Sequence, residues 1–262
     1  MTYEAFTFEV ADGIGHITLD QPDRGNPFDG PFCAELSLIA AECDENPEVR
    51  AVLIDAAGKY FSVGADLRVL GRDRADLPRF TKSATTGLHS AISRFSRMDA
   101  PVVAAVHGLA VGGGVSLAAA ADFCLAGGSA RFYAAYAGIG LSPDGGGTHA
   151  LTRLVGPRRA TEFYLRNQTW TADEAAARGL VSEVVDDAEL GKRARELALE
   201  LAGGPTRAFG EMKNLLLAAV DQPLEALLEA EARAMGRVTR TEDSWNAITA
   251  VSAKQRPTFE GH

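Results

Sequence analysis

Apolar and polar residues alternate near the start of the chain in two short segments, AFTFEV and IGHITLD. Asp12-Gly13 lies between them, and Asp-Gly is a favoured dipeptide in tight hairpin turns, so we expect a β-hairpin here. A loop rich in proline, glycine and asparagine follows, QPDRGNPFDGP. Beyond this loop the spacing becomes that of an amphipathic helix, whose buried face should consist of Phe32, Leu36, Ile39, Ala40 and Cys43.

Farther along, strand-like and helix-like segments alternate. RAVLIDAAG and PVVAAVHG predict buried strands, GVSLAAAAD predicts a helix of small residues, and ARFYAAYAGIG predicts a third strand or a turn. Between the two buried strands, residues 72–100 are polar and predict a helix. The segment TWTADEAAARGLVSEVV begins a helix at a capping box of Thr171 and Glu174 and ends in a strand. This alternation predicts an α/β fold with a parallel type of sheet.

The pattern changes after Gly203-Gly204-Pro205, where three amphipathic helices follow and no further strand is indicated. A length of 262 residues suits one large domain with a helical extension. We therefore expect residues 1–204 to form the α/β core domain and residues 205–262 to form a helical region for oligomerisation. The helices carry more apolar surface than three helices bury alone, namely Leu215, Leu216, Leu217, Leu224, Leu227, Leu228 and Trp245.

Composition narrows the range of partners. Hydrophobic residues make up 46% and charged residues 23% of the chain, as in ordinary globular proteins. The net charge of −9 argues against a nucleic-acid partner, because phosphate binding needs clustered basic side chains. The stretch from 100 to 121 is nearly free of charge, but it contains Pro101 and a glycine triplet, so we expect no membrane-spanning helix. The first residues lack the pattern of a signal peptide.

Cysteine and histidine usage predict neither disulfides nor a metal site. The cysteines are widely spaced and form no CxxC pair, which is typical of a protein of the reducing cytoplasm; they are Cys33, Cys43 and Cys124. Ligand-like spacing is also missing from the histidines His16, His107, His149 and His262. We therefore expect a cytoplasmic protein that binds no metal.

Two strand-to-helix junctions are rich in glycine, FSVGADL at residues 61–67 and GLAVGGG at residues 108–114. Glycine lets a ligand approach the main chain, and the first N–H groups of a helix have no internal partner. Two such turns that face each other would direct two N–H groups at one oxygen, as an oxyanion requires. Tight packing of strand against helix is the structural alternative, and a single glycine triplet alone favours it. Neither turn fits GxGxxG, so a dinucleotide site is poorly supported.

A third glycine cluster, SPDGGGT at residues 142–148, precedes the predicted helix THALTRLVG. Asp144 lies within it, shortly before the helix. Aspartate is a frequent N-cap residue, so a helix cap is the structural interpretation of Asp144. The functional interpretation is a carboxylate that takes part in chemistry, and the residue type alone leaves both open.

Together these segments resemble the crotonase family, the enoyl-CoA hydratases and isomerases, over essentially the whole chain. The resemblance implies a spiral of ββα units with a C-terminal helical trimerisation region, and a homotrimer or homohexamer. It also implies an acyl-coenzyme A thioester as substrate, with coenzyme A as its handle and no separate cofactor. The matching pieces are ITLDQPDRGNPFD, FSVGADL, APVVAAVHGLAVGGGVSLAAAAD, GLSPDGGGTHALTRLVG, ADEAAARGLVSEVV and AKQRPTF.

The resemblance also assigns residues to the site. The oxyanion donors should be the backbone N–H groups of Ala65 and Gly113. The residues that should contact the substrate or its coenzyme A moiety are Arg24, Ser62, Gly64, Asp66, Leu67, Gly112 and Tyr136. By its residue type, Asp66 is equally suited to cap a helix.

Departures from the family pattern bear on the reaction. Hydratases of the family carry two glutamates, and Ser116 and Tyr136 stand at those positions here. Neither side chain is a carboxylate base, and tyrosine is a poor base near neutral pH. Asp144 stands where dienoyl-CoA isomerases, phenylacetyl-CoA ring-epoxide isomerases and 4-chlorobenzoyl-CoA dehalogenases place an aspartate. The stretch PDGGGT is most similar to the ring-epoxide isomerase type.

The resemblance thus implies a double-bond isomerase in which Asp144 moves a proton by way of an enolate. Three other interpretations stay open: a hydratase that uses substitute residues, a hydrolytic dehalogenase with Asp144 as nucleophile, and a non-catalytic acyl-CoA-binding protein. Dehalogenases also use a helix histidine, but His89 lies about one helical turn too far from Pro101 to align with it. We expect His89 to be a surface or helix-packing histidine.

Overall fold

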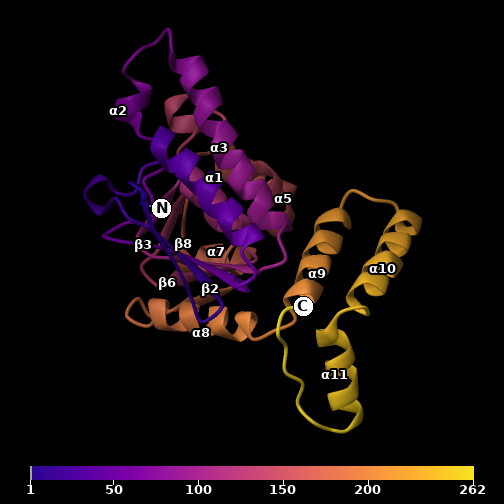
Figure 1. Cartoon of the computed structure of the whole chain (residues 1–262). Helices are drawn as coiled ribbons and strands as arrows, with labels where there is room; N and C mark the ends of the chain where they lie inside the picture. The colour runs from indigo at the N-terminus through magenta and orange to yellow at the C-terminus, as the bar shows by residue number, and fades with distance from the viewer. Residues whose placement is uncertain (1) are drawn as a thin grey trace.

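The computed structural model describes residues 2–262, which form two sheets surrounded by helices (Figure 1). The larger sheet consists of β1 (Phe6–Ala11), β2 (Ile14–Leu19), β3 (Ala51–Ala56), β4 (Val102–Val106), β6 (Phe123–Gly127) and β9 (Glu183–Val185), in this order across the sheet. The smaller sheet consists of β5 (Leu109–Val111), β7 (Arg131–Tyr133) and β8 (Thr169–Thr171). In the larger sheet β1 runs antiparallel to β2, and the other strands pair in parallel.

Successive turns of the chain give one strand to each sheet. Strand β4 of the larger sheet is followed by β5 of the smaller sheet, and β6 and β7 repeat this arrangement. A helix follows each pair, α4 (Gly113–Ala120) after β5 and α5 (Gly147–Val155) after β7. The predicted α/β fold, a spiral of ββα units, is confirmed.

Helices cover both faces of the larger sheet. The helices before the C-terminal region, besides α4 and α5, are α1 (Gly30–Glu45), α2 (Leu67–Leu70), α3 (Leu77–Arg97), α6 (Pro157–Leu165), α7 (Ala172–Arg178) and α8 (Leu190–Ala202), with 3₁₀ turns η1 (Pro22–Arg24) and η2 (Ala137–Ile139). The C-terminal helices are α9 (Thr206–Ala218), α10 (Leu224–Val238) and α11 (Glu242–Ser252). Strand β3 shows how helices divide the core. Val52 and Ile54 pack into the main core with α1 and α3, whereas Ala51 and Leu53 pack against α8. Burial on both faces explains the unbroken apolar run of this strand.

Several local predictions are confirmed. The hairpin turn is at Asp12-Gly13, with positive φ angles of 55° and 78°. The capping box of Thr171 and Glu174 forms at the start of α7. The sequence did not predict strand β6, because FCLAG is short and directly follows a helix of small residues. Its pairing with β4 and β9 makes it a strand.

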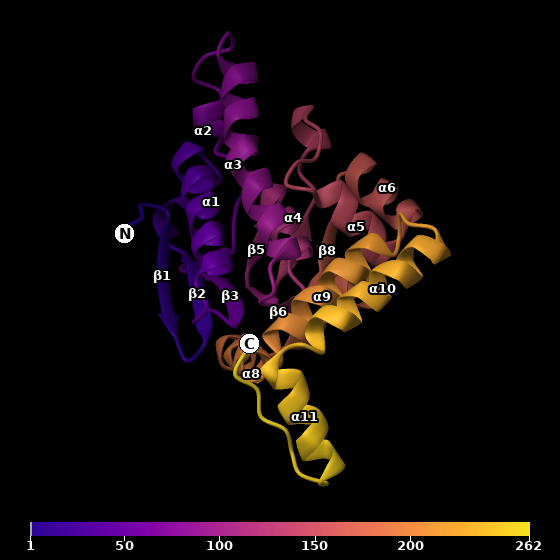
Figure 2. The same cartoon turned by 45° about the vertical axis from the view of Figure 1, so that its right-hand side comes forward.

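The C-terminal helices extend away from the two sheets, and Figure 2 shows α9 and α10 side by side with α11 beyond them. They form three helices after residue 205, as predicted. More than half of the large apolar side chains that are exposed lie here: Met212, Leu216, Val220, Leu224, Leu228, Met235, Trp245, Ile248 and Val251. Association of subunits through this surface stays a prediction. In the part of the chain that the structure describes, no helix is both long and apolar enough to cross a bilayer.

Candidate active site

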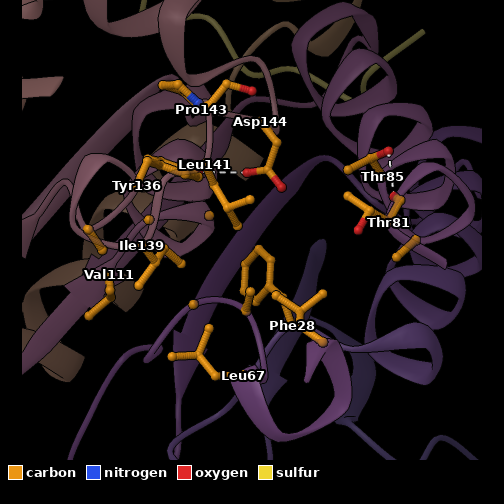
Figure 3. Close-up of a pocket in the computed structure, with 18 of the residues that line it drawn as sticks. Phe28, Leu67, Thr81, Thr85, Val111, Tyr136, Ile139, Leu141, Pro143 and Asp144 are labelled. Carbon is orange, nitrogen blue, oxygen red and sulfur yellow. Dashed lines mark hydrogen bonds between the residues drawn. The ribbon is translucent and has the colours of Figure 1, made fainter. Parts of the chain in front are cut away.

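A cavity of about 760 Å³ lies between helix α3, the two glycine turns and the loop that leads to α5 (Figure 3). Among the described residues that line it, Asp144 is the one carboxylate, and neither lysine nor arginine is present. A largely apolar cavity with a few polar groups is typical of a site for an organic ligand. Its apolar wall consists of Phe28, Val63, Leu67, Leu70, Leu77, Phe80, Ala84, Leu88, Val111, Ile139, Leu141 and Pro143.

The two glycine turns lie side by side along one wall of this cavity. The backbone of Ser62 pairs with that of Ala110 as in a parallel sheet. Ser62 donates its N–H to the carbonyl of Leu109 (3.1 Å), and Val111 donates its N–H to the carbonyl of Ser62 (2.9 Å). Gly64 has a φ of 76°, and a Cβ there would lie 2.7 Å from the carbonyl oxygen of Val111. Glycine is therefore required for the two turns to approach this closely.

Two backbone N–H groups are left unpaired at the cavity. The bridge between Ala65 and Phe28 is made through Gly64 and Asp66, so the N–H of Ala65 has no acceptor within residues 2–262. Gly113 begins α4, where the first N–H groups have no partner inside the helix, and its N–H also has no acceptor among those residues. A Cβ on Gly113 would lie 2.8 Å from the ring of Phe28, so the close packing requires glycine. Both unpaired donors line the cavity.

Three residues predicted to contact the substrate do not line the cavity: Arg24, Ser62 and Asp66. Ser62 is fully buried, and its hydroxyl donates to a backbone carbonyl (2.8 Å) and accepts the N–H of Gly64 (3.0 Å). Asp66 caps α2 by accepting the N–H of Arg68 (2.9 Å), and it also accepts a hydrogen bond from Arg24 (2.6 Å). These contacts hold the first glycine turn in shape. The predicted residues that do line the cavity are Gly64, Ala65, Leu67, Gly112, Gly113, Tyr136 and Asp144.

Asp144 does not cap the helix that follows it. Helix α5 begins after the N-cap Gly146, and no side chain accepts an N–H at that end. Instead, Oδ1 of Asp144 accepts a hydrogen bond from the hydroxyl of Tyr136 at 2.6 Å. Figure 3 shows the carboxylate directed into the cavity. The hydrogen bonds of the described residues include this one to Oδ1 and none to Oδ2. The cap interpretation is therefore wrong, because the glycines after Asp144 separate it from the helix.

Tyr136 and Cys33, which line the cavity with Asp144, are held in their protonated forms. Tyr136 is 8% exposed; its burial raises its pKa, and the negative charge of Asp144 raises it further. Its hydroxyl is therefore a hydrogen-bond donor to the carboxylate and not a base. Burial raises the pKa of Cys33, which also lines the cavity, to about 12, with a smaller contribution from Asp144. The thiol is accordingly not a nucleophile at neutral pH.

Two side chains to which the sequence assigned no role hold the turn that carries Asp144. The hydroxyl of Ser116, on α4, donates to the carbonyl oxygen of Asp144 at 2.9 Å. The N–H of Gly145 donates to Nε2 of His89, on α3, at 3.1 Å. His89 is exposed, as expected of a surface histidine, but it also lines the cavity. No local motif signals either contact, because the partners come from separate helices.

Acidic, histidine and cysteine side chains within residues 2–262 do not gather anywhere in groups of three or more that could hold a metal ion. The cavity instead combines two unpaired backbone donors with one carboxylate. A Cβ on Gly113 would lie 3.7 Å from Oδ1 of Asp144, so the second donor and the carboxylate are neighbours. Donors of this kind stabilise an oxygen that gains negative charge, and a carboxylate at this distance is placed to move a proton of the same ligand.

Comparison with known proteins gives a consistent result. Residues 9–262 match the model of the family described as enoyl-CoA hydratase/isomerase. A protein of Rhodobacter capsulatus described as a probable enoyl-CoA hydratase is 36% identical over all of both chains. The 1,2-epoxyphenylacetyl-CoA isomerase of Escherichia coli K12 is 32% identical over 96% of this chain and 97% of its own. The crystal structure of an enoyl-CoA hydratase from Polaromonas superposes with a TM-score of 0.92, at 29% identity, over 98% of this chain and all of the other.

Proposed function

The chain belongs to the enoyl-CoA hydratase/isomerase family, and from that membership we propose that it moves a carbon–carbon double bond within an acyl-CoA thioester. The observation that carries this proposal is the single carboxylate of the cavity. One carboxylate oxygen of Asp144 is held by Tyr136, and the other has no hydrogen-bond partner among residues 2–262; the carboxylate also lies beside two backbone donors that are unpaired within those residues. A base and an oxyanion site are sufficient for isomerisation, which consumes no water.

In this mechanism the thioester oxygen binds between the N–H groups of Ala65 and Gly113. Removal of a proton from a carbon of the acyl group places negative charge on that oxygen, and the two donors stabilise the resulting enolate. Each donor contributes about 3 kcal/mol to the transition state. Gly64, Leu67 and Gly112 line the approach to the oxygen, whereas Arg24, Ser62 and Asp66 act by shaping the turn beneath it.

Asp144 is the proposed base. Its Oδ2 takes a proton from one carbon, the double bond shifts, and the same carboxyl group returns a proton to another carbon, so the substrate and the enzyme end with unchanged composition. Tyr136 keeps its own proton and orients Oδ1 through the 2.6 Å hydrogen bond. The apolar residues around the carboxylate limit the access of water to the enolate.

Hydration is the less suitable reaction for this site. Addition of water requires a group that takes a proton from the water molecule, and the family's hydratases use two glutamates for the task. Ser116 directs its hydroxyl to the carbonyl of Asp144, and Tyr136 retains its proton. No second carboxylate lines the cavity among the described residues.

For hydrolysis with Asp144 as nucleophile, one observation is favourable and another is unfavourable, and both concern His89. The position of His89 next to the Asp144 turn places a histidine close enough to activate water. However, Nε2 of His89 accepts the N–H of Gly145, so in the neutral ring the proton is on Nδ1. Neither nitrogen then offers a free lone pair to water, which favours isomerisation.

The lining of the cavity supports an uncharged acyl group. No lysine or arginine among the described residues lines the cavity, and its carboxylate would repel a second carboxylate. Burial of a charged group without a partner is costly, whereas the apolar wall stabilises an aliphatic or aromatic group. Acyl-CoA substrates that carry a free carboxylate are therefore expected to be poor substrates.

We also propose that the protein is a homotrimer or homohexamer assembled through residues 205–262. The exposed apolar side chains of α9, α10 and α11 support this, because subunit contacts would bury them. Light scattering should give a trimer or hexamer, and a stable monomer at micromolar concentration would contradict the proposal.

The activity is tested by incubating the purified protein with crotonyl-, 3-enoyl-, dienoyl- and 4-chlorobenzoyl-CoA and following each by chromatography and mass spectrometry. We expect the 3-enoyl or dienoyl thioester to change retention time at constant mass, which is the sign of an isomer. Dominant addition of water to crotonyl-CoA would instead identify a hydratase, and loss of chloride from the aromatic thioester a dehalogenase.

A further inference from the structure

The peptide group between Asp144 and Gly145 is held at both of its ends. Its carbonyl accepts the hydroxyl hydrogen of Ser116 at 2.9 Å, and its N–H donates to Nε2 of His89 at 3.1 Å. The two partners come from different helices, α4 and α3, and lie far from Asp144 in the sequence. A peptide group is a rigid plane, so two contacts at opposite ends prevent its rotation.

The contact with Ser116 is not needed to satisfy the carbonyl of Asp144. That oxygen already accepts the N–H of Gly147 at 3.0 Å within the turn. The hydroxyl of Ser116 therefore adds a constraint rather than a missing hydrogen bond. Ser116 is only 1% exposed, and a Cβ added to Gly145 would lie 3.0 Å from the Cβ of Ser116. The side chain of Ser116 therefore packs tightly against the turn.

The third point of attachment is on the carboxylate itself. The fixed peptide plane holds the Cα of Asp144 in place, and the hydroxyl of Tyr136 holds Oδ1 at the other end of the side chain. Oδ2 is then the one oxygen of the residue without a protein donor in the described part of the chain. Its position relative to Gly113 depends on all three contacts.

We infer that Ser116 and His89 are positioning residues that clamp the Asp144–Gly145 peptide and thereby aim Oδ2 at the substrate. This inference rests on the proposed role of Asp144 as the base. Ser116 stands at the position of a hydratase glutamate, so the clamp replaces a group that would otherwise act on water. His89 acts through Nε2, which accepts the N–H of Gly145.

Four variants test the clamp in the full-length protein, with isomerisation of the best thioester of the panel as the assay. His89→Leu removes the acceptor, His89→Gln keeps an oxygen in place of Nε2, and Ser116→Ala removes the donor; the fourth variant combines His89→Leu with Ser116→Ala. We expect His89→Leu and Ser116→Ala each to lower kcat about 10-fold, because a small misplacement of a reacting group is costly. His89→Gln should stay within about 3-fold of wild type, since its amide oxygen still accepts the N–H of Gly145.

The double variant distinguishes a shared clamp from two separate effects. Loss of either contact already frees the same rigid peptide, so the second loss should add little. We expect kcat of the double variant to fall about 10- to 30-fold in total, whereas two independent 10-fold effects would multiply to about 100-fold. Affinity of the Ser116→Ala variant for a saturated acyl-CoA, which cannot react, should be unchanged, because Ser116 does not line the cavity. A product of independent effects, or equal losses in His89→Leu and His89→Gln, would overturn the inference.

A measurement that does not depend on turnover separates the clamp from the proposed reaction. Hydrogen exchange read by mass spectrometry should show faster amide exchange over residues 141–147 in His89→Leu and Ser116→Ala than in wild type. The matched controls are His262→Leu, whose imidazole lies beside Glu260, and Ser96→Ala, whose hydroxyl donates to the carbonyl of Ile92; both should exchange like wild type over residues 141–147. Unchanged exchange in the clamp variants would overturn the clamp, whereas normal isomerisation by Asp144→Asn would overturn the reaction on which it rests.

Discussion

The two walls of the cavity are built on opposite principles. On the wall of the glycine turns, the polar groups at the cavity are backbone N–H groups, and their positions follow from close contacts such as that of Gly64 with Val111. On the wall of Asp144, the polar group at the cavity is a side chain, and its position follows from contacts with Tyr136, Ser116 and His89. The first wall is fixed by main-chain geometry, and the second by a network of side chains from several elements.

This difference determines which substitutions each wall tolerates. A change of side chain leaves a backbone donor in place provided that the turn still fits, so the first wall is sensitive to proline and to added volume. The second wall loses its function with a change of a single atom, because one oxygen of Asp144 does the proposed chemistry. Substitutions chosen for each wall therefore test whether the backbone donors and the carboxylate contribute separately to turnover.

The largest effect is expected on the side-chain wall. Asp144→Asn keeps the size of the side chain and removes the base, so isomerisation should fall by about 10²–10⁴-fold. Asp173→Asn, at the exposed first turn of α7, is the matched control and should have wild-type activity. Normal turnover of a folded Asp144→Asn protein would show that Asp144 has no role as a base.

The backbone wall should respond next. Ala65→Pro removes an N–H that has no acceptor within residues 2–262, and we expect kcat to fall about 100-fold through loss of one oxyanion donor. Ala65 is exposed and has a Cβ already, whereas proline at Gly113 would collide with Phe28. Ala65→Ser retains the N–H and should be nearly as active as wild type. Full activity of Ala65→Pro with an unchanged melting temperature would assign the donor to another residue.

Removal of a support should have a smaller effect than removal of the base. Tyr136→Phe deletes the hydroxyl that orients Oδ1, and we expect about a 10-fold decrease in kcat, because the carboxylate gains freedom while its basic oxygen remains. Tyr164→Phe is the matched control: its ring packs against that of Tyr136, but its hydroxyl makes no hydrogen bond to Asp144. A loss in Tyr136→Phe as large as that in Asp144→Asn would mean that Tyr136 transfers the proton itself.

The smallest effect on turnover is expected from Asp66, which supports the backbone wall and whose side chain is 5% exposed. Burial alone would raise the pKa of Asp66, but hydrogen bonds from Arg68 and Arg24 outweigh it and hold the pKa well below its ordinary value. A lowered pKa in the folded state contributes stability above the unfolded pKa of about 4, and that stability is lost as the pH falls.

Asp66→Asn should therefore lower the free energy of unfolding by about 1–3 kcal/mol at pH 7, measured in urea. The difference from wild type should shrink as the pH is lowered below about 4, because Asp66 then takes up a proton in the unfolded state while the folded protein still holds it ionised. A difference that is independent of pH would show that the charge of Asp66 does not stabilise the turn.

The sequence predicted the backbone wall better than the side-chain wall, and the reason is the range of the interactions. The hairpin turn at Asp12-Gly13, the capping box at Thr171 and the glycine turns depend on residues that are close together in the chain, so their residue types reveal them. Asp144 was identified through its surroundings in the motif PDGGGT, but its residue type left both a cap and a base open.

The contacts that hold Asp144 at the cavity are not local. The hydrogen bond between Gly145 and His89 joins residues that are 56 positions apart in the sequence, and the one between Asp144 and Ser116 joins residues that are 28 positions apart. Neither pair forms a pattern in the sequence. Strand β6 is a similar case, because FCLAG becomes a strand only through its neighbours in the sheet. In contrast, the helical region after residue 205 was predicted from its apolar spacing alone, although the subunits that would cover it are not visible in a single chain.

The central claim, that this site moves a double bond by way of an enolate and does not add water, is tested most directly with the unmodified protein. A 3-enoyl-CoA is incubated with it in deuterated water, and the product is analysed by mass spectrometry. Because the proton on a carboxyl group exchanges with solvent, the account predicts a 2-enoyl-CoA that contains carbon-bound deuterium and no added oxygen. A 3-hydroxyacyl-CoA as the main product, formed equally fast from crotonyl-CoA, would contradict it.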